Sequence, residues 1–180
     1  MTRYSRLTVA AAVALGLGAR PVLDGLLMAK FSRDLARLND GDYRPLLSNY
    51  SDDAVLLFHD GPHRWAGPQH GRHAGKAAIE EFLREYVNAG VQGTIVKLWT
   101  AGPPWALTMI TRFDDYADGP EGQRLYQNQA VLVLRTRFTK IIEQRDFYID
   151  TDRIIQFDRA LDLHGVRWIS SQLNSPARDE

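Results

Sequence analysis

The second half of the chain reads as four strands joined only by short turns, and this feature constrains the fold more than any other. The strands are expected at residues 93–100, 105–116, 125–138 and 140–150. Glycine and proline mark the turns between them, and connections this short favour antiparallel neighbours. A long meander with a helix on one face tends to curl into a half-barrel, because sheets twist. Its concave face then needs either a large core or a ligand.

Helical patterns come before these strands. Pro21 suits the first turn of a helix, and apolar residues then recur at helical spacing as far as Asn39. Gly41 suits the left-handed cap that ends this helix, and a second helix is expected at 43–50. A strand at 54–59, a Gly/Pro-rich loop at 60–72, a helix at about 74–88 and a short closing helix at 154–163 complete the order. Helices first and consecutive strands afterwards predict an α+β fold.

The composition bounds the class of protein. The 180 residues suit one domain, and 44% of them are hydrophobic, so the chain can bury a real core. Lysine plus arginine equals aspartate plus glutamate at 22 each, and this balance lacks the basic footprint of a nucleic-acid binder. The chain has no cysteine, which excludes disulfides, thiolate nucleophiles and cysteine-ligated metals.

The N-terminus has an apolar segment of its own. Arg3 and Arg6 precede residues 7–19, which have the layout of a secretory signal but are too short to span a bilayer. This segment is either removed on export or kept as an apolar helix that packs on the domain or rests on a membrane. We expect a cytoplasmic protein, with export or membrane association through residues 7–19 as the alternative. The expected division is an N-terminal segment (1–20), one domain (21–164) and a polar C-terminal tail (165–180).

Four stretches carry a resemblance that covers residues 22 to 164. They are LNDGDY at 38–43, YSDDAV at 50–55, GRHAGKAAI at 71–79 and KIIEQRDFYID at 140–150. In the order of its elements and in these motifs, the chain resembles the SnoaL-like, nuclear-transport-factor-2-like (NTF2-like) superfamily. The resemblance implies a cone-shaped half-barrel whose curved antiparallel sheet wraps around N-terminal helices, and it implies a homodimer. The superfamily contains isomerases, dehydratases, cyclases, epoxide hydrolases and non-enzymatic binders, so fold alone does not choose a function.

Polar residues on two strands suggest one function in particular. Arg112 and Asp114 point to the same side of their strand, since side chains alternate. With Asp146 on a later strand they resemble the polar motif of the limonene-epoxide-hydrolase branch. That resemblance implies Asp146 as the general base on water, Asp114 as the proton donor and Arg112 as the bridge between them. The alternative is a salt-bridge network that braces the sheet or faces water.

The isomerase branch of the superfamily gives another comparison. That branch has an aspartate base near the end of its first strand, where Asp60 lies, and a tyrosine on its first helix, where this chain has Phe31. Tyr126 or Tyr148 is the candidate substitute for the missing hydroxyl donor. The epoxide-hydrolase branch also holds water with a tyrosine and an asparagine on its first strand. Neither residue occurs at 54–59, and Asp60 or Asn128 is the candidate substitute.

Aromatic residues indicate what the cavity binds. A subset of them lining a pocket favours a small hydrophobic molecule such as a terpenoid, a steroid or a polyketide. The candidate ligand-binding residues are Phe58, Asp60, Trp65, Tyr126, Asn128 and Tyr148. A non-catalytic ligand-binding protein and a dimeric interaction module stay open beside the enzyme, since both use the same fold.

Histidines crowd one loop, at positions 59, 63, 70 and 73. Histidine is the commonest metal ligand, but this spacing matches no standard zinc site. We therefore interpret them as polar loop residues near the cavity and expect neither a metal nor a cofactor. No glycine pattern typical of phosphate binding occurs, so nucleotide binding is not supported.

Overall fold

The structure is a computed structural model that describes residues 3–166, with side chains from residue 20 onward. The helices are α1 (Arg3–Asn39), α2 (Arg44–Leu47), η1 (Arg64–Ala66, a 3-10 turn), α3 (Lys76–Asn88) and α4 (Thr151–Leu163). The strands are β1 (Tyr50–Leu57), β2 (Arg72–Ala74), β3 (Gln92–Ala101), β4 (Thr108–Asp118), β5 (Arg124–Arg137) and β6 (Lys140–Tyr148). The expected tail at 165–180 lies outside the described residues from residue 167 on.

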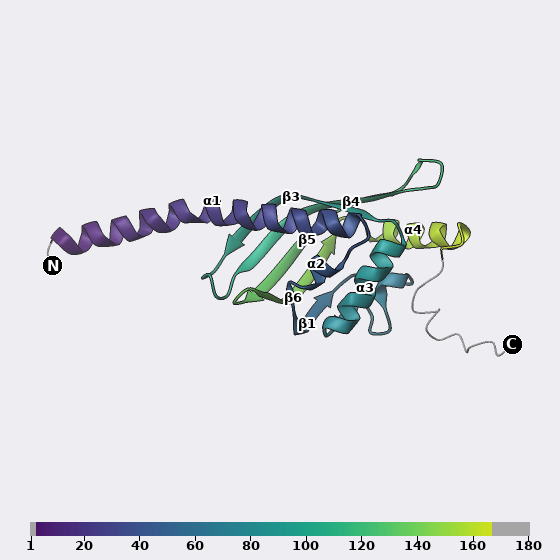
Figure 1. Ribbon diagram of the computed structural model, residues 1–180, viewed down its shortest axis with the longest axis horizontal. Helices are drawn as coiled ribbons and strands as arrows, with labels where there is room; N and C mark the ends of the chain where they lie inside the picture. The colour runs from purple at the N-terminus through teal and green to yellow at the C-terminus, as the bar shows by residue number, and fades with distance from the viewer. Residues whose placement is uncertain (1–2, 167–180) are drawn as a thin grey trace.

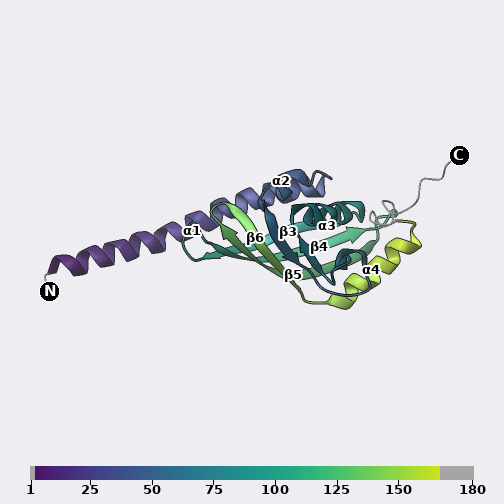
Figure 2. The same cartoon turned by 90° about the horizontal axis from the view of Figure 1, so that it is seen from below.

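The described residues form one six-stranded sheet in the order β2-β1-β6-β5-β4-β3 (Figure 1). Neighbouring strands are antiparallel except β1 and β6, which are parallel. The register shifts between Ile95 and Lys97 in β3, and again between Arg135 and Thr136 in β5. Such irregularities bend a strand and increase its twist. The sheet is accordingly curved and unclosed, and this confirms the predicted α+β half-barrel (Figure 2).

The core lies between the concave face of the sheet and the helices. On α1 the buried side chains are Phe31, Leu35 and Leu38, spaced so that they share one helical face. On α3 the equivalent face carries Ile79 and Phe82, with their neighbours Leu83 and Tyr86. These are the faces that the apolar spacing predicts.

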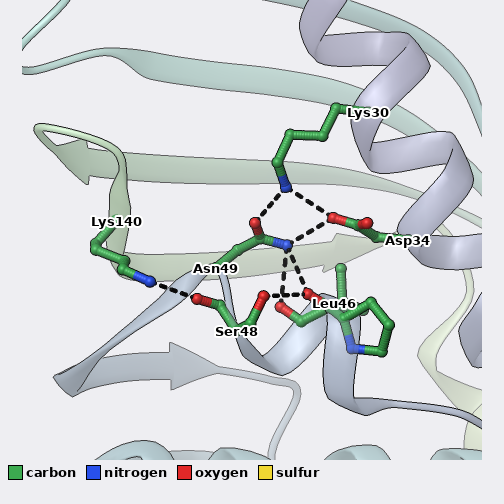
Figure 3. Close-up of polar contacts among 7 residues, drawn as sticks. Lys30, Asp34, Leu46, Ser48, Asn49 and Lys140 are labelled. Carbon is green, nitrogen blue, oxygen red and sulfur yellow. Dashed lines mark hydrogen bonds and ion pairs between the residues drawn. The ribbon is translucent and has the colours of Figure 1, made fainter.

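A polar cluster holds α1 against the junction of α2 and β1 (Figure 3). Lys30 Nζ lies 2.8 Å from Asp34 Oδ2 and also donates to Asn49 Oδ1. The Asn49 amide donates to Asp34 Oδ2 at 2.9 Å and to the carbonyl of Leu46 at 3.1 Å. On α1, Phe31 lies between Lys30 and Asp34, and Leu35 follows Asp34. The cluster therefore fixes how the apolar face of α1 meets the sheet.

A second anchor joins the loop before β2 to α4. The Arg64 side chain is fully buried, and its Nε donates to Asp158 Oδ1 at 2.5 Å. Its Nη2 donates to Asp162 Oδ1 and to the carbonyl of Val166, both at 3.1 Å. Two carboxylates and a carbonyl around one guanidinium give the charge-assisted contacts that a buried cation requires.

The start of α1 differs from the prediction. The helix begins at Arg3 and runs through Pro21, so it is continuous across the expected boundary at residue 20. Proline removes one N–H donor from a helix, but side-chain contacts secure the residues around it. Arg20 Nη2 donates to the Gly102 carbonyl at 2.6 Å, and the Thr100 hydroxyl donates to Asp24 Oδ1 at 2.6 Å. Among the described residues no helix offers a stretch long and apolar enough to cross a membrane.

Two further differences concern the first strands. Tyr50 starts β1, whereas the prediction gave it to the second helix, which ends at Leu47. The short strand β2 was not predicted; it pairs with β1 through Val55 and Ala74. Gly75 separates β2 from α3 with a φ of 84°, a conformation that favours glycine, so the strand and the helix are distinct elements.

The convex face of the sheet carries large apolar side chains among charged ones. Trp99, Ile110, Val131 and Phe147 are exposed on β3, β4, β5 and β6 in turn. An exposed apolar patch rimmed by charge is typical of an interaction surface. The expected homodimer through this face stays a prediction.

Candidate active site

An apolar cavity opens between α1, α3 and the concave face of the sheet. The cavity has a volume of about 80 Å³. Fourteen of its twenty lining residues are apolar, and they come from α1, α2, α3, β1 and the strands β3 to β6. The polar exceptions are Tyr50, Tyr86, Thr111, Gln144, Asp146 and Tyr148. Cavities of this kind bind small hydrophobic molecules and orient them with a few polar groups.

The three residues expected to form a triad do not meet. Arg112 and Asp114 do share a face, with Arg112 Nε 3.8 Å from Asp114 Oδ1, but that face is the convex one. Their side chains are 53% and 37% exposed. Asp146 lines the cavity on the concave side. The prediction of an arginine between two carboxylates is therefore wrong. Side chains alternate along β4, so Thr111 and Phe113 face the cavity while Arg112 and Asp114 face the opposite side of the sheet.

Asp146 is held in place by a chain of two hydrogen bonds. The Tyr50 hydroxyl donates to Gln144 Oε1 at 2.5 Å, and Gln144 Nε2 donates to Asp146 Oδ1 at 2.8 Å. Gln144, Asp146 and Tyr148 alternate along β6, so all three reach the same face. Within the described part of the chain, Asp146 Oδ2 has no hydrogen-bond partner, and Asp146 retains some exposure through the cavity.

Burial sets the protonation of Asp146. Loss of hydration raises the pKa of its carboxyl group to about 7, against the hydrogen bond from Gln144, which lowers it. The nearby charge of Asp115 raises it further. A carboxyl group with this pKa is ionised in a substantial fraction of molecules at neutral pH and can both accept and release a proton.

A second buried carboxyl group lies behind a wall of tyrosines. The Tyr148 hydroxyl donates to Asp115 Oδ2 at 2.8 Å, and the Tyr126 hydroxyl does so at 3.4 Å. The other oxygen of Asp115 has no partner among the described residues, although the residue is only 2% exposed. Burial raises the pKa of Asp115 to about 7, while the two tyrosine hydrogen bonds oppose this shift. Asp115 borders a small cavity of about 10 Å³ that is separate from the main one.

Tyr86 and Tyr148 line both cavities and so form the partition between them. The Tyr86 hydroxyl is buried and has no hydrogen-bond partner within the described residues. Burial, and then the charge of Asp115, raise the pKa of Tyr86 well above its ordinary value, so the group stays a proton donor. Gly93 makes room for it, since a Cβ there would lie 2.9 Å from the Tyr86 oxygen and 2.5 Å from Phe113.

The predicted ligand-binding residues divide into two groups. Phe58, Trp65, Tyr126 and Tyr148 border the small cavity, and Tyr148 also borders the large one. Asn128 and Asp60 border neither cavity. The Asn128 amide donates to the Asp150 carbonyl at 2.6 Å and so supports the turn into α4.

Asp60 is exposed in the loop, with Oδ2 3.4 Å from His70 Nδ1. It lies outside both cavities, so it is not positioned to act as a base on a bound molecule or to bind a water there. Two of the other histidines of this region, His63 and His73, are buried. His73 Nε2 lies 2.8 Å from the Trp65 carbonyl, and His63 is buried with its ring stacked on His59. Burial lowers the pKa of His63 to about 4, so its ring is neutral. No group of three metal-ligating side chains occurs among the described residues.

Sequence reasoning missed five polar residues of this site: Tyr50, Tyr86, Thr111, Asp115 and Gln144. A usable signal existed for Asp115. On β4 the apolar residues Met109, Phe113 and Ala117 alternate with polar ones, and Asp115 has the parity of the apolar set. The alternation therefore assigns Asp115, and not Asp114, to the inside.

Comparison with known proteins adds the fold class. No family model matches the chain, and no curated protein matches its sequence. An NTF2-like protein of unknown function from Burkholderia pseudomallei is 14% identical, with a TM-score of 0.54, covering 73% of this chain and 95% of that one. A protein from Rhodopseudomonas palustris, provisionally named an isomerase, is 19% identical, with a TM-score of 0.51 and coverage of 71% and 92%. TerC, co-crystallised with polyporic acid, is 17% identical, with a TM-score of 0.51 and coverage of 70% and 92%.

These similarities show that the chain has the NTF2-like cone fold. They confirm that part of the resemblance in its sequence. They do not single out the epoxide-hydrolase branch, and at these identities they carry the fold alone.

Proposed function

We propose that the protein is a cofactor-free acid–base enzyme of the isomerase type, which moves a proton within a small hydrophobic molecule bound in the main cavity. Asp146 is the base that removes a proton from carbon. Tyr86 donates a hydrogen bond to the substrate oxygen on which negative charge develops. Both residues border the same cavity.

One observation carries this proposal above the others. Asp146 is oriented through one oxygen by Gln144, and its second oxygen has no partner among the described residues in an otherwise apolar cavity. A general base needs this combination of fixed orientation, a free lone pair and a pKa near the working pH.

The lining indicates the substrate class. Apolar side chains make up most of the lining, and four of the six polar lining residues stand on β6 and α3. We therefore propose a largely hydrophobic substrate with a single carbonyl or enol oxygen, of the terpenoid, steroid or polyketide type. Two structural neighbours are consistent with this choice: one provisionally named an isomerase, and TerC, co-crystallised with polyporic acid.

Epoxide opening is the second candidate reaction, since Asp146 could also take a proton from water. The cavity supports it with room for several waters, given that one water needs roughly 10–15 Å³. The proton donor would then be Tyr86, because Arg112 and Asp114 lie on the opposite face of the sheet. We rank this reaction lower because attack on an epoxide needs a water held beside Asp146. Apart from that of Tyr86, the hydroxyl of the lining that has no partner among the described residues belongs to Thr111, which stands on β4, two strands away from β6.

The two reactions separate in one experiment. The protein is incubated in D₂O with a panel of hydrophobic ketones and epoxides, and mass spectrometry follows deuterium at carbon and diol formation. Asp146→Asn is expected to slow deuterium incorporation by about 10²–10⁴-fold, and Tyr86→Phe by about 10²–10³-fold. The matched control is Asp114→Asn, which changes the same residue type on the convex face. Equal losses in Asp114→Asn and Asp146→Asn would refute the assignment, and ligand binding without any turnover would favour the non-catalytic binding protein.

A further inference from the structure

Two hairpin tips lie beside the place where α1 leaves the sheet. Arg20 on α1 donates to the Gly102 carbonyl in the β3–β4 turn at 2.6 Å. The backbone N–H of Phe138, in the β5–β6 turn, donates to the Trp105 carbonyl at 2.7 Å. Figures 1 and 2 both show the two turns at the end of the sheet toward which the N-terminal half of α1 projects. This end of the domain is called the hairpin end below.

Large apolar side chains are exposed at the hairpin end. Trp105 is 62% exposed and Phe138 is 71% exposed. On α1, just after Arg20, Val22 and Leu26 are 63% and 66% exposed, and their spacing puts them on one helical face. Aromatic side chains at the tips of turns contribute little to the fold, so their presence calls for an external partner.

The backbone at Phe138 strengthens this argument. Arg137 pairs with Lys140, so Phe138 and Thr139 are the two central residues of a tight turn. Such turns favour glycine, asparagine or aspartate, because the central residues adopt positive φ. Phe138 has a φ of 54°, which is unfavourable for a bulky side chain. An exposed phenylalanine in this conformation stabilises neither the turn nor the core. We therefore infer that Phe138 contacts a binding partner.

The charges that flank the β5–β6 tip are basic, whereas Asp24, near the β3–β4 tip, accepts a hydrogen bond from Thr100. Arg137 and Lys140 flank Phe138, and neither forms an ion pair with a carboxylate among the described residues. The nearest acid on β6, Glu143, already pairs with Arg135 and Arg145. Basic residues next to exposed aromatic ones fit a surface that is anionic outside and apolar beneath, and the surface of an anionic phospholipid bilayer has this chemistry.

The sequence that continues α1 points to the same partner. Residues 7–19 are apolar and follow Arg3 and Arg6, but they are too short to span a bilayer. A single short lipid contact gives only marginal and reversible attachment, whereas two contacts together are stable. The hairpin end lies next to Arg20, the residue that follows this segment. A lipid contact at the hairpin end would therefore add to the lipid contact of residues 7–19.

We propose that the hairpin end docks on an anionic phospholipid surface through Trp105 and Phe138, with Arg137 contacting the lipid headgroups. Residues 7–19 supply the other lipid contact. The proposal is independent of the chemistry in the cavity.

The test measures the binding of the full chain to vesicles by flotation, with neutral phosphatidylcholine and with mixed phosphatidylcholine–phosphatidylserine. The double change Trp105→Ala with Phe138→Ala is expected to weaken partitioning into mixed vesicles about tenfold, as expected when two partly inserted aromatic rings are removed. Its matched control is Phe147→Ala with Ile149→Ala, which removes equally exposed apolar side chains away from the tips. Thermal melts confirm that each variant is folded.

Charge is tested separately. Arg137→Gln is expected to weaken binding to mixed vesicles about fivefold and to leave binding to neutral vesicles unchanged, while Arg112→Gln on the convex face changes neither. Failure of the full chain to float, or equal flotation of the double variant and the unchanged protein, would overturn the proposal. So would light scattering in which the double variant dissociates an oligomer, since the tips would then bind a second copy of the chain.

Discussion

Replacing Asp146 with asparagine is expected to stabilise the protein at neutral and alkaline pH while it removes the proposed base. Asparagine keeps an oxygen that accepts the hydrogen bond from Gln144, so the local geometry survives the change. What disappears is the cost of ionising a carboxyl group away from water. The variant therefore separates the stability of the fold from the chemistry of the cavity.

The magnitude follows from the pKa of Asp146, which burial raises from 3.8 to about 7. Between these values the folded state holds more protons than the unfolded state, so stability falls as pH rises through this window. The loss is complete above pH 7 and nearly absent at about pH 4. At about 1.4 kcal/mol for each pKa unit, the whole shift corresponds to roughly 4 kcal/mol, of which we expect roughly 2–4 kcal/mol from the Asp146 carboxyl group alone. Asp115 is coupled to this group, so part of the gain belongs to the pair.

The assay is urea unfolding, followed by circular dichroism, at about pH 4.5 and pH 8. The stability advantage of Asp146→Asn over the unchanged protein is expected to be small at the lower pH and about 2–4 kcal/mol at the higher one. Asp114→Asn, which changes the same residue type on the convex face, is the control. An advantage of equal size at both pH values, or a loss of stability at both, would refute the buried and ionisable Asp146 on which the proposed function depends.

Two more predictions concern other parts of the fold. Arg64→Leu leaves Asp158 buried without its cation, so the free energy of unfolding is expected to fall by about 3–5 kcal/mol in the same urea assay; an unchanged midpoint would show that this anchor contributes little. If the chain forms a homodimer through the convex face, Phe147→Lys is expected to convert it to a monomer in light scattering, because it places a charge in the apolar patch. The same mass for both proteins would exclude that interface.

The order of the elements could be predicted because its signals are local. Glycine and proline mark the turns around the meander, and the apolar spacing of α3 and of the second half of α1 identifies their buried faces. The strand β2 escaped because three residues carry no periodicity, and only pairing with β1 defines it. The continuation of α1 through Pro21 escaped because proline normally marks a helix start.

The site was predicted less well than the fold, and the reason differs from residue to residue. The sequence singled out Asp146 as a candidate base, and the structure places it in the lining of the cavity, but β6 alternates too weakly for its sequence to show which face is inside. On β4 the alternation does predict that Asp115 faces inward. The resemblance to a polar motif instead led to Asp114, which lies on the convex face. The proposed role of Tyr86 depends on Gly93, which makes room for its hydroxyl, and a contact between a helix and a distant strand leaves no local trace in the sequence.

The helix α1 is both a wall of the cavity and the carrier of the apolar N-terminal segment. Phe31, the first of its residues to line the cavity, stands twelve positions after residue 19, roughly 18 Å along the helix axis. If the hairpin end rests on lipid, the cavity therefore lies within one helix length of the bilayer. A guest that dissolves in lipid and barely in water would then be supplied from the membrane, and its partition coefficient, rather than its concentration in solution, would set how often the cavity is filled.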